Sequence, residues 1–555
     1  MKKRIGIGEL DFKELIVKDL YYVDKTMFAK DIIDDDSKAI LITRPRRFGK
    51  TINMSMLDYF FNIDKKDSKK LFKGLKIMDQ GEEYTSKLGK YPCIYLSLAD
   101  VKTQTYNEMI TSMKTIIHEI YCNFRYLLDS DKLFDDEKNY IRDILNFKIE
   151  EDRLFISVKD LSNFLSRHYN QKVIILIDEY DAPLQNAYSE GFYDKAKKYI
   201  GQFYEATIKS NIYCEKAILT GVSRISKESI FSDLNNLSVY TVMNKDYAKD
   251  FGFTNEEIDK IIEDYEIEDE KEEIKKWYDG YKMGNVDNIY NPWSVLKYIK
   301  HNELKPYWVN TSSNDIIKMI IKKSYGIKEK IERLLNDEEI EVAVKLETVL
   351  KDVEKNENNI WGLFIQTGYL KVVEELEKNK CKVKIPNLEI KGLFEEIIEE
   401  WFEGKISGDA LNDILSDLIN LRFEEYEEKF KILVREMISY MDVGVNIAEN
   451  FYHAFVLGIL VGLKDKYYVR SNRESGIGRY DIMLEPIEKN GNAFIMEFKV
   501  YREGREKDIN ETLRNAKEQI ENKGYETELK SRGYNNITKM VYAFNGKDVK
   551  LEWYK

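Results

Sequence analysis

The stretch RPRRFGKT, residues 44–51, has the residue types that bind the phosphates of a nucleotide. Gly49, Lys50 and Thr51 match the end of the pattern G-x-x-x-x-G-K-[ST], whereas Arg44 stands where the first glycine is expected. In such a loop the backbone N–H groups surround phosphate oxygens, the lysine reaches the β- and γ-phosphates, and the threonine hydroxyl can bind Mg²⁺. We therefore expect ATP and Mg²⁺ as cofactors, with Lys50 and Thr51 among their contacts.

Arg44 does not rule out this role. Because Pro45 follows it, Arg44 is expected to be extended, and the loop can close after it. The arginines of the stretch add positive charge, which favours a polyphosphate. The residues expected to form the phosphate cradle are Arg46, Arg47, Phe48 and Gly49.

A pair of acidic residues ends an aliphatic run further along the chain. Val173 to Ile177 are five consecutive aliphatic residues, followed by Asp178 and Glu179. Such a run is typical of a parallel strand that is covered on both faces. At the end of this strand Asp178 could hold Mg²⁺, and Glu179 could orient or activate the attacking water. Either pattern alone also occurs without a nucleotide, the acidic pair as a strand-end cap, but their order and context favour a nucleotide site.

A second group of candidate residues lies near the C-terminus. Glu497 and Lys499 are two residues apart in an expected strand, so both side chains point to one face. Together with Asp481 they could hold Mg²⁺ and stabilise the charge of a reacting phosphodiester. The sequence E-F-K alone is also ordinary for a half-exposed strand.

These residues need a framework of strands and helices to position them. Apolar runs predict strands at 39–43, 91–100, 173–177 and, with a following loop, 214–226. Helical spacing follows Thr51 and recurs at about 106–129, 158–169 and 193–210. Strands that alternate with helices predict a doubly wound α/β domain with a parallel sheet.

The whole chain is expected to have four parts. We expect an α/β ATPase domain at 1–240, a helical lid or winged-helix-like region at 241–345, a helical linker at 346–439 and a second α/β domain at 440–555. The aromatic residues of the second part are expected to pack in the core and between domains rather than stack on a ligand, namely Trp277, Tyr278, Tyr281, Trp293 and Trp308. The fourth part has the predicted order helix, three strands, helix, strand.

The first part resembles a known family. The segments YYVDKT, RPRRFGKT, LIDEYDAPL and LTGVSRISKESIFSDLNNL, followed by WYDGY, YNPWS and YWVNTSSN, resemble the AAA-ATPase-like family of prokaryotic P-loop proteins over about residues 4–320. In that family arginine is the usual residue in place of the first glycine. The resemblance implies Lys50 and Thr51 as phosphate and Mg²⁺ contacts and Asp178 and Glu179 as the acidic pair. It also implies a sensor strand ending in LTGVSRIS, from which Arg224, Thr220 or Ser223 could face the γ-phosphate. We expect Arg224, for which an ion pair is the alternative.

The last part resembles a different family. GRYD, EFK and the flanking helices are similar to the PD-(D/E)XK nuclease superfamily over about residues 440–548, although no proline precedes the aspartate. The resemblance implies a restriction-endonuclease-like fold and Mg²⁺-dependent nuclease activity. The catalytic residues it implies are Asp481, Glu497, Lys499 and Gln519, and the metal ligands are Glu449, Asp481 and Glu497.

Composition narrows the class of protein. The chain has 555 residues, of which 43% are hydrophobic and 34% charged, as in a globular protein. Its four cysteines and four histidines are scattered, which argues against a zinc cluster or a disulfide framework. No stretch approaches the roughly 18 apolar residues of a membrane span, and no signal peptide is recognisable, so we expect a cytoplasmic protein without a membrane partner.

The expected function joins both sites. The net charge of −12 argues against a general coat for nucleic acid but leaves room for a local basic groove. We expect an ATP-binding and ATP-hydrolysing protein coupled to a Mg²⁺-dependent nuclease that acts on nucleic acid, DNA rather than RNA, with a homo-oligomer left open. One alternative is a nucleotide-gated switch whose nuclease-like domain only binds nucleic acid or a partner protein. Another is a nuclease whose P-loop domain binds ATP without hydrolysing it.

Overall fold

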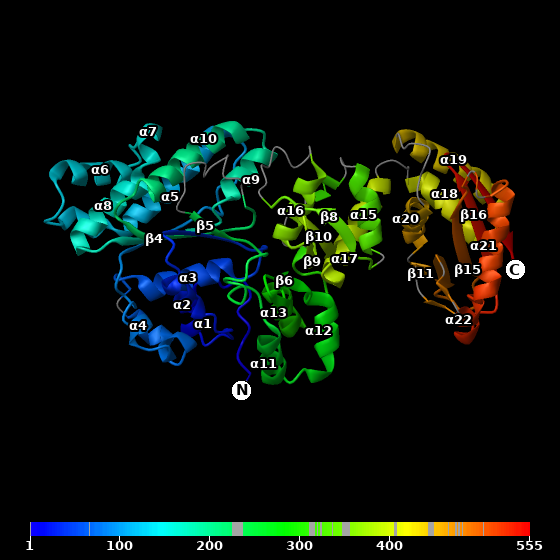
Figure 1. Cartoon of the computed structure of the whole chain (residues 1–555), viewed down its shortest axis with the longest axis horizontal. Coiled ribbons are helices and arrows are strands. Elements are labelled where there is room, and N and C mark those ends of the chain that lie inside the picture. The colour runs from blue at the N-terminus through cyan, green and yellow to red at the C-terminus, as the bar shows by residue number, and fades with distance from the viewer. Residues whose placement is uncertain are drawn as a thin grey trace. The chain divides into compact units, whose positions relative to one another are not determined.

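The described residues form two compact units. The computed structural model describes residues 2–65, 67–224, 237–309, 317–318, 320–321, 325–335, 337–346, 356–403, 408–441, 449–463, 465–471, 474–475, 478–479, 481–502, 504 and 506–555 (Figure 1). The first unit comprises Met1–Lys323 and Glu339–Lys391, and the second comprises Ser324–Glu338 and Gly392–Lys555. The four-part division expected from the sequence stays a prediction beside these two units.

The first unit is built on a parallel sheet of five strands. Their spatial order is β2-β3-β4-β1-β5, and every neighbouring pair is parallel. The strands are β1 Ala39–Thr43, β2 Cys93–Ser97, β3 Val173–Asp178, β4 Cys214–Gly221 and β5 Leu237–Tyr240. The predicted doubly wound α/β fold is confirmed, because the chain order of the strands crosses over within the sheet.

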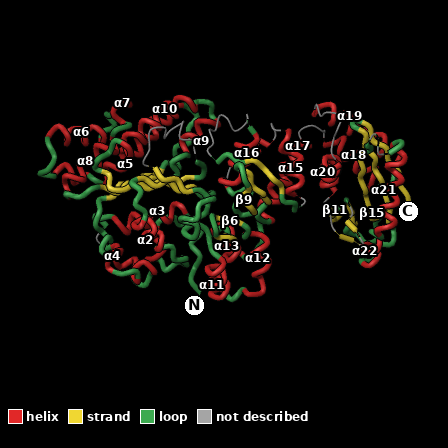
Figure 2. Tube along the Cα trace, in the orientation of Figure 1, coloured by secondary structure: helices red, strands yellow, loops and turns green. Residues whose placement is uncertain are grey.

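Helices cover both faces of this sheet. Figure 2 shows α5, α8 and α10 on one side and α2, α3 and α4 on the other. The helices of this part are α1 Phe12–Val17, α2 Met27–Asp34, α3 Lys50–Phe61, α4 Glu82–Thr85, α5 Tyr106–Asn123, α6 Asp135–Leu145, α7 Glu151–Leu154, α8 Ser157–Tyr169, α9 Ala182–Ser189 and α10 Tyr193–Tyr204. The predicted helix at 106–129 ends at Asn123 and continues as a 3-10 turn, and the one at 193–210 ends in a π turn.

The aliphatic runs are explained by a core on each face. Ile40 and Ile42 of β1 pack into the core beneath α3, whereas Leu41 packs into the core beneath α5 and α8. Ile175 and Ile177 of β3 likewise pack into the core beneath α5 and α8. Because successive side chains of a strand point to opposite faces, a strand buried on both sides must be apolar throughout.

The rest of the first unit mixes helices with two small sheets. Its helices are α11 Asn255–Tyr265, α12 Lys271–Tyr278, α13 Pro292–His301 and α16 Glu357–Thr367. Its strands form the hairpin β6 Tyr281–Met283 and β7 Val286–Ile289, and the antiparallel sheet β8-β10-β9 of Ile340–Ala343, Lys380–Lys384 and Lys371–Leu376. The predicted core role of the aromatic residues is confirmed for Tyr278, Tyr281 and Trp308, which are 0%, 3% and 1% exposed. Trp277 and Trp293 are only partly buried, and Trp293 lines a cavity.

The helical expectation for 346–439 is wrong where β9 and β10 form. Lys378 and Asn379 join these strands with φ of 60° and 58°, which is the left-handed backbone that a tight hairpin turn needs. The alternating pattern of KCKVK, with Cys381 and Val383 buried, also favours a strand over a helix. The charged composition of this region hid that alternation.

The second unit is built on a mixed sheet of five strands in the order β11-β14-β15-β16-β17. Only β15 and β16 are parallel, and the other neighbours are antiparallel. The strands are β11 Tyr467–Ser471, β14 Ile482–Pro486, β15 Ala493–Val500, β16 Ile537–Asn545 and β17 Asp548–Tyr554, with the two-residue strands β12 Glu474–Ser475 and β13 Gly478–Arg479 between them. The helices of the unit are α15 Tyr325–Leu335, α18 Gly408–Ile419, α19 Phe423–Met441, α20 Glu449–Leu460, α21 Ile509–Lys523 and α22 Glu526–Ser531, and α17 Leu388–Glu403 has residues in both units.

The predicted order of this unit is confirmed. Helix α20, three strands, α21 and β16 follow one another as expected, and β17 adds an edge strand. Leu513 and Ile520 of α21 pack against Ile495 and Val541 of the sheet. Tyr452 of α20 stacks on Phe544 with ring centroids 3.9 Å apart. None of the helices in the described ranges combines the length and apolar character that a membrane-crossing helix requires.

Candidate active sites

The predicted phosphate loop connects β1 to α3. The strand ends at Thr43 and the helix begins at Lys50, so the loop delivers its backbone to a helix N-terminus. Gly49 has a φ of 88°, a left-handed conformation that glycine adopts without strain, and Arg47 also has a positive φ of 66°. The turn of these residues and the helix N-terminus together favour an anion.

Arg44 lies directly after β1, where the parallel strands end. Its side chain is fully buried, and the guanidinium donates to the carbonyl oxygens of Thr43 at 2.8 Å, Tyr247 at 2.9 Å and Tyr240 at 3.2 Å. Burial lowers the pKa of Arg44 to about 10. The carbonyl groups compensate for the loss of water around the guanidinium. The Arg44 side chain is therefore bound to backbone carbonyl groups, and the expectation that its charge favours a polyphosphate stays a prediction.

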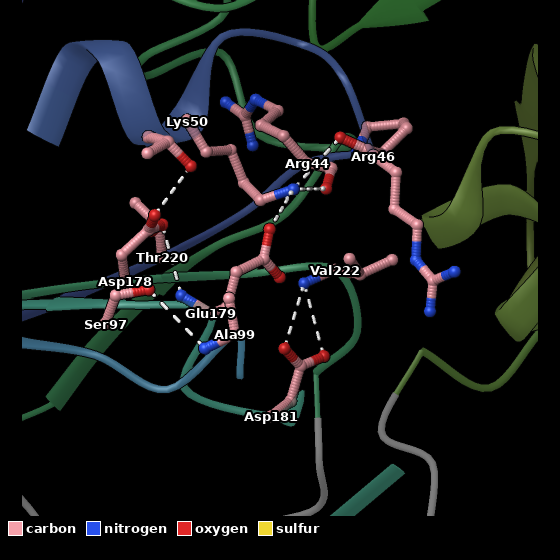
Figure 3. Close-up of polar contacts among 12 residues, drawn as sticks. Arg44, Arg46, Lys50, Ser97, Ala99, Asp178, Glu179, Asp181, Thr220 and Val222 are labelled. Atoms are coloured by element: carbon pink, nitrogen blue, oxygen red, sulfur yellow. Dashed lines mark hydrogen bonds and ion pairs between the residues drawn. The ribbon is translucent and has the colours of Figure 1, made fainter. Parts of the chain in front are cut away.

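Lys50 lies at the centre of the loop. Its side chain is 3% exposed, and Nζ donates to the carbonyl oxygens of Arg44 at 3.3 Å and Pro45 at 3.2 Å. Glu179 Oε1 lies 3.3 Å from the same nitrogen (Figure 3). The ammonium group is thus held inside the curve of the loop, beside the end of β3.

Asp178 and Thr51 are in direct contact. The Thr51 hydroxyl donates to Asp178 Oδ2 at 2.6 Å, and the Thr220 hydroxyl donates to Oδ1 at 2.5 Å. Burial, and then the charge of Glu179, raise the pKa of the Asp178 carboxyl above its ordinary value. The hydroxyl and carboxylate oxygens are the hard ligands that Mg²⁺ prefers, so Thr51 and Asp178 fit a magnesium site. The described residues hold no group of three or more His, Cys, Asp or Glu side chains that could hold a metal, so phosphate and water oxygens would complete the shell.

Glu179 faces the space in front of the loop. It has a φ of 52°, an uncommon conformation for a residue with a side chain, and its side chain is 23% exposed. The backbone N–H of Glu179 donates to Asp178 Oδ1 at 3.1 Å. The two neighbouring carboxylates therefore differ in environment, because that of Asp178 is fully buried and bound to Thr51, whereas that of Glu179 is partly exposed and lies beside Lys50.

One cavity of about 400 Å³ connects these groups. Its lining includes charged and polar residues, among them Arg46, Lys50, Lys102, Glu179 and Gln185. It also includes apolar and aromatic residues, among them Leu10, Tyr22, Phe253, Trp293 and Leu296. A lining that combines both kinds of residue suits a nucleotide, whose phosphates and base need these two environments. Arg47, Phe48, Gly49 and Thr51 also line the cavity, as predicted.

Arg224 lies elsewhere. Its backbone N–H donates to Gln366 Oε1 at 2.6 Å, and it is not among the described residues that line the cavity. Its expected role at the γ-phosphate stays a prediction. Asp181, which the sequence interpretation passed over, is fully buried beside the cavity and accepts from the backbone N–H of Ser223 at 2.8 Å. Its position in the stretch DEYDAPL is the signal that could have identified it.

Trp308 forms a hydrogen bond to the backbone of the phosphate loop. The indole Nε1 of Trp308 donates to the carbonyl oxygen of Arg46 at 2.8 Å. The backbone N–H of the same residue donates to the buried carboxyl of Glu389 at 2.5 Å, and the Ser294 hydroxyl donates to that carboxyl at 2.9 Å. Burial raises the pKa of Glu389 to about 7.

The second candidate site lies on β14 and β15. Asp481 precedes β14, and the register Ile482↔Met496 places it opposite Glu497. The backbone N–H of Phe498 donates to Asp481 Oδ2 at 2.8 Å. Lys499 Nζ lies 3.1 Å from Glu497 Oε1, and the Gln519 amide donates to the same oxygen. The structure thus brings together Asp481, Glu497, Lys499 and Gln519.

The donor set of this site fits a hard cation. Asp481 and Glu497 offer carboxylate oxygens from neighbouring strands, so these residues would hold Mg²⁺. Glu449 begins α20, but its side chain lies outside the described residues, and its metal role stays a prediction. Tyr525 joins the site, because Gln519 Nε2 lies 3.3 Å from its hydroxyl, and burial raises the pKa of that hydroxyl.

Comparison with known proteins identifies both regions. Residues 4–231 match the model of a family described as predicted AAA-ATPase, and residues 447–554 match the PD-(D/E)XK nuclease superfamily. An uncharacterized protein from the vnfD 5′ region of Azotobacter chroococcum mcd 1 is 24% identical over 556 residues, which cover 96% of this chain and 95% of that protein. The parallel sheet of the first unit is thus that of a P-loop domain, and the mixed sheet of the second is that of a nuclease-like domain.

Proposed function

We propose that this chain, which joins a predicted AAA-ATPase domain to a PD-(D/E)XK nuclease superfamily domain, binds and hydrolyses ATP and cleaves nucleic acid. The contact between Thr51 and Asp178 is the main support for the first activity, because it places two oxygen atoms that could bind Mg²⁺ next to the phosphate loop. The group around Glu497 supports the second.

At the first site each residue has a distinct task. Lys50 and the loop N–H groups bind the phosphate oxygens, and Thr51 and Asp178 hold the magnesium ion, which neutralises phosphate charge when bound. Glu179 is the residue that accepts a hydrogen bond from the attacking water, because it faces the cavity while Asp178 is covered by two hydroxyl groups. A left-handed backbone at Glu179 turns its side chain towards that space.

At the second site Glu497 is held between a cation and an amide. Lys499 lies next to its carboxylate and is placed to stabilise negative charge on a cleaved phosphodiester. Asp481 faces the same carboxylate from the neighbouring strand. We propose DNA rather than RNA as the substrate, with cleavage that requires Mg²⁺.

Two variants test this proposal. Purified protein is incubated with ATP, Mg²⁺ and a panel of single-stranded and double-stranded DNA and RNA. Lys50→Ala should abolish ATP turnover, and Glu497→Ala should abolish cleavage while ATP turnover continues. Exposed residues provide matched controls, Lys69→Ala and Glu488→Ala, which should retain both activities.

The same panel separates the alternative functions. If Glu497→Ala and the wild type bind nucleic acid equally and neither cleaves it, the chain is a nucleotide-gated binding protein rather than a nuclease. If cleavage occurs but ATP turnover is absent in the wild type, the P-loop domain binds ATP without hydrolysing it. An unchanged ATPase rate in Lys50→Ala would exclude the assigned phosphate site.

A further inference from the structure

A buried network connects Asp181 to the end of β4. Asp181 Oδ2 accepts from the backbone N–H of Ser223 at 2.8 Å, from its hydroxyl at 2.8 Å and from the backbone N–H of Val222 at 3.2 Å. The same oxygen accepts from Gln185 Nε2 at 2.7 Å, one helical turn further along α9. These donors come from two segments, the residues after β4 and helix α9, and Gln185 of α9 lines the cavity.

This network fixes the orientation of the Gln185 amide. Backbone N–H groups can only donate, so Asp181 Oδ2 is an acceptor, and the group of Gln185 that faces it must be the NH₂. The carbonyl Oε1 of Gln185 must then point the other way. There it accepts from Arg46 Nη2 at 3.3 Å. Asp181 therefore determines which atom of Gln185 the arginine meets.

Arg46 has a neutral partner, because its guanidinium donates to the Gln185 amide and forms an ion pair with no carboxylate among the described residues. Burial, and then the charge of Arg46, lower the pKa of Arg47, so two cations lie close together in this loop. Lys102 lines the cavity as well. An excess of positive charge in a confined space favours an anion with several oxygens.

The position of Glu179 indicates which phosphate that anion is. Arg46, Gln185 and Glu179 all line the cavity, and Glu179 Oε1 lies 3.3 Å from Lys50 Nζ of the phosphate loop. The phosphate that reacts with water must lie near Glu179. A terminal phosphate bound there lies in the cavity that Arg46 also lines. Figure 3 shows Arg44 and Arg46 extending in different directions, and of these two arginines only Arg46 lines the cavity.

We propose that Arg46 contacts the terminal phosphate of bound ATP, and that Gln185 and Asp181 are positioning residues that hold its guanidinium there. This inference rests on the proposed ATPase function and adds to it the residue that distinguishes ATP from ADP. A guanidinium placed in advance stabilises the charge that gathers on the terminal phosphate oxygens during transfer. The arginine comes from the same chain as the loop, so a second copy is not needed to supply it.

Nucleotide binding and turnover by the full chain test the inference. Dissociation constants are measured for ADP and for a non-hydrolysable β,γ-imido analogue of ATP, together with kcat and KM for ATP. Arg46→Ala should weaken binding of the analogue by roughly 10- to 100-fold, the range for a charge-assisted hydrogen bond, with ADP affinity within about twofold of wild type. Gln185→Ala should lower kcat by roughly 3- to 10-fold, with ADP affinity again unchanged.

Two variants serve as controls, and each contrary result contradicts one particular claim. Arg142→Ala and Gln202→Ala, both at exposed positions, should match the wild type, and far-ultraviolet circular dichroism checks that each variant is folded. Equal weakening of ADP and analogue binding by Arg46→Ala would overturn the inference, because the arginine would then contact an inner phosphate. Unchanged kcat in Gln185→Ala would exclude the positioning role. Absence of any nucleotide binding by the wild type would instead refute the proposed function itself.

Discussion

The hydroxyl of Thr51 and the carboxylate of Asp178 meet at 2.6 Å, although 126 residues separate them in the chain. One stands in the first turn of α3 and the other ends β3, and these elements are brought together because β3 and β1 flank β4 in the sheet. The contact places a hydroxyl and a carboxylate oxygen side by side where the strands end, and a proposed magnesium ion would find two oxygen ligands there.

Thr51→Ala should lower the kcat for ATP by roughly 100-fold, because the variant lacks the hydroxyl that the metal needs while Lys50 remains. Thr51→Ser keeps that hydroxyl and should stay within about fivefold of wild type. The measurement is steady-state phosphate release at saturating ATP over a series of Mg²⁺ concentrations. Equal activity in both variants would show that the hydroxyl is not a ligand.

Arg44→Gly restores the common loop pattern, yet it should destabilise the protein. The change removes a buried guanidinium and leaves carbonyl groups of Thr43, Tyr240 and Tyr247 without their donor, at a cost of about 3 kcal/mol in the free energy of unfolding. Urea unfolding followed by circular dichroism measures the difference, with the exposed Arg142→Gly as the control. A variant as stable as wild type would contradict the structural role of Arg44.

Glu389 should make stability depend on pH. Burial raises its pKa from 4.5 to about 7, so between these values the native state holds a proton that the unfolded state has lost. The free energy of unfolding therefore falls as pH rises through this window, by about 3 kcal/mol at most. Glu389→Gln lacks this titration, so the advantage of the wild type over the variant should be largest at pH 4.5 and absent at pH 8.

Urea unfolding of both proteins at several pH values tests this prediction. Asp250 and Asp279, whose pKa values burial raises to about 7 and about 6, change both proteins alike and cancel in the comparison. A difference between wild type and Glu389→Gln that is the same at pH 4.5 and pH 8 would show that Glu389 titrates normally.

Gln519→Ala should lower nucleic-acid cleavage by roughly 10-fold without changing ATP turnover. The amide orients the Glu497 carboxylate, and its loss frees that group to rotate. Tyr525→Phe, which removes only the hydroxyl that contacts Gln519, should have a smaller effect in the same direction. The measurement is the rate of cleavage of a labelled oligonucleotide, and an ATPase rate that falls in parallel would indicate general misfolding instead.

Much of the fold could be predicted because its signals are local. The aliphatic run before Asp178 specified a strand buried on both faces, and the two-residue spacing of Glu497 and Lys499 placed them on one side of β15. The pairing of Asp481 with Glu497 followed from a short hairpin. Each of these inferences depends on a few neighbouring residues and the geometry of a single element.

The remaining features depend on contacts between distant segments. Arg44 is buried because carbonyl groups about 200 residues later lie against it, and nothing in its own neighbourhood indicates their position. The pairing of Gln185 with Arg46 likewise requires the sheet to be assembled first. The strands β9 and β10 were hidden by a composition that is typical of helices.

The burial of Arg44 also bears on how phosphate loops are recognised. The common pattern has glycine at the first position of the loop. In this chain the position holds an arginine, whose side chain extends away from the loop to backbone carbonyl groups near the end of the sheet. A search pattern that demands glycine does not find such a loop. Chains with a long basic residue there, followed by proline, deserve inspection for a matching row of backbone carbonyls before their nucleotide sites are dismissed as degenerate.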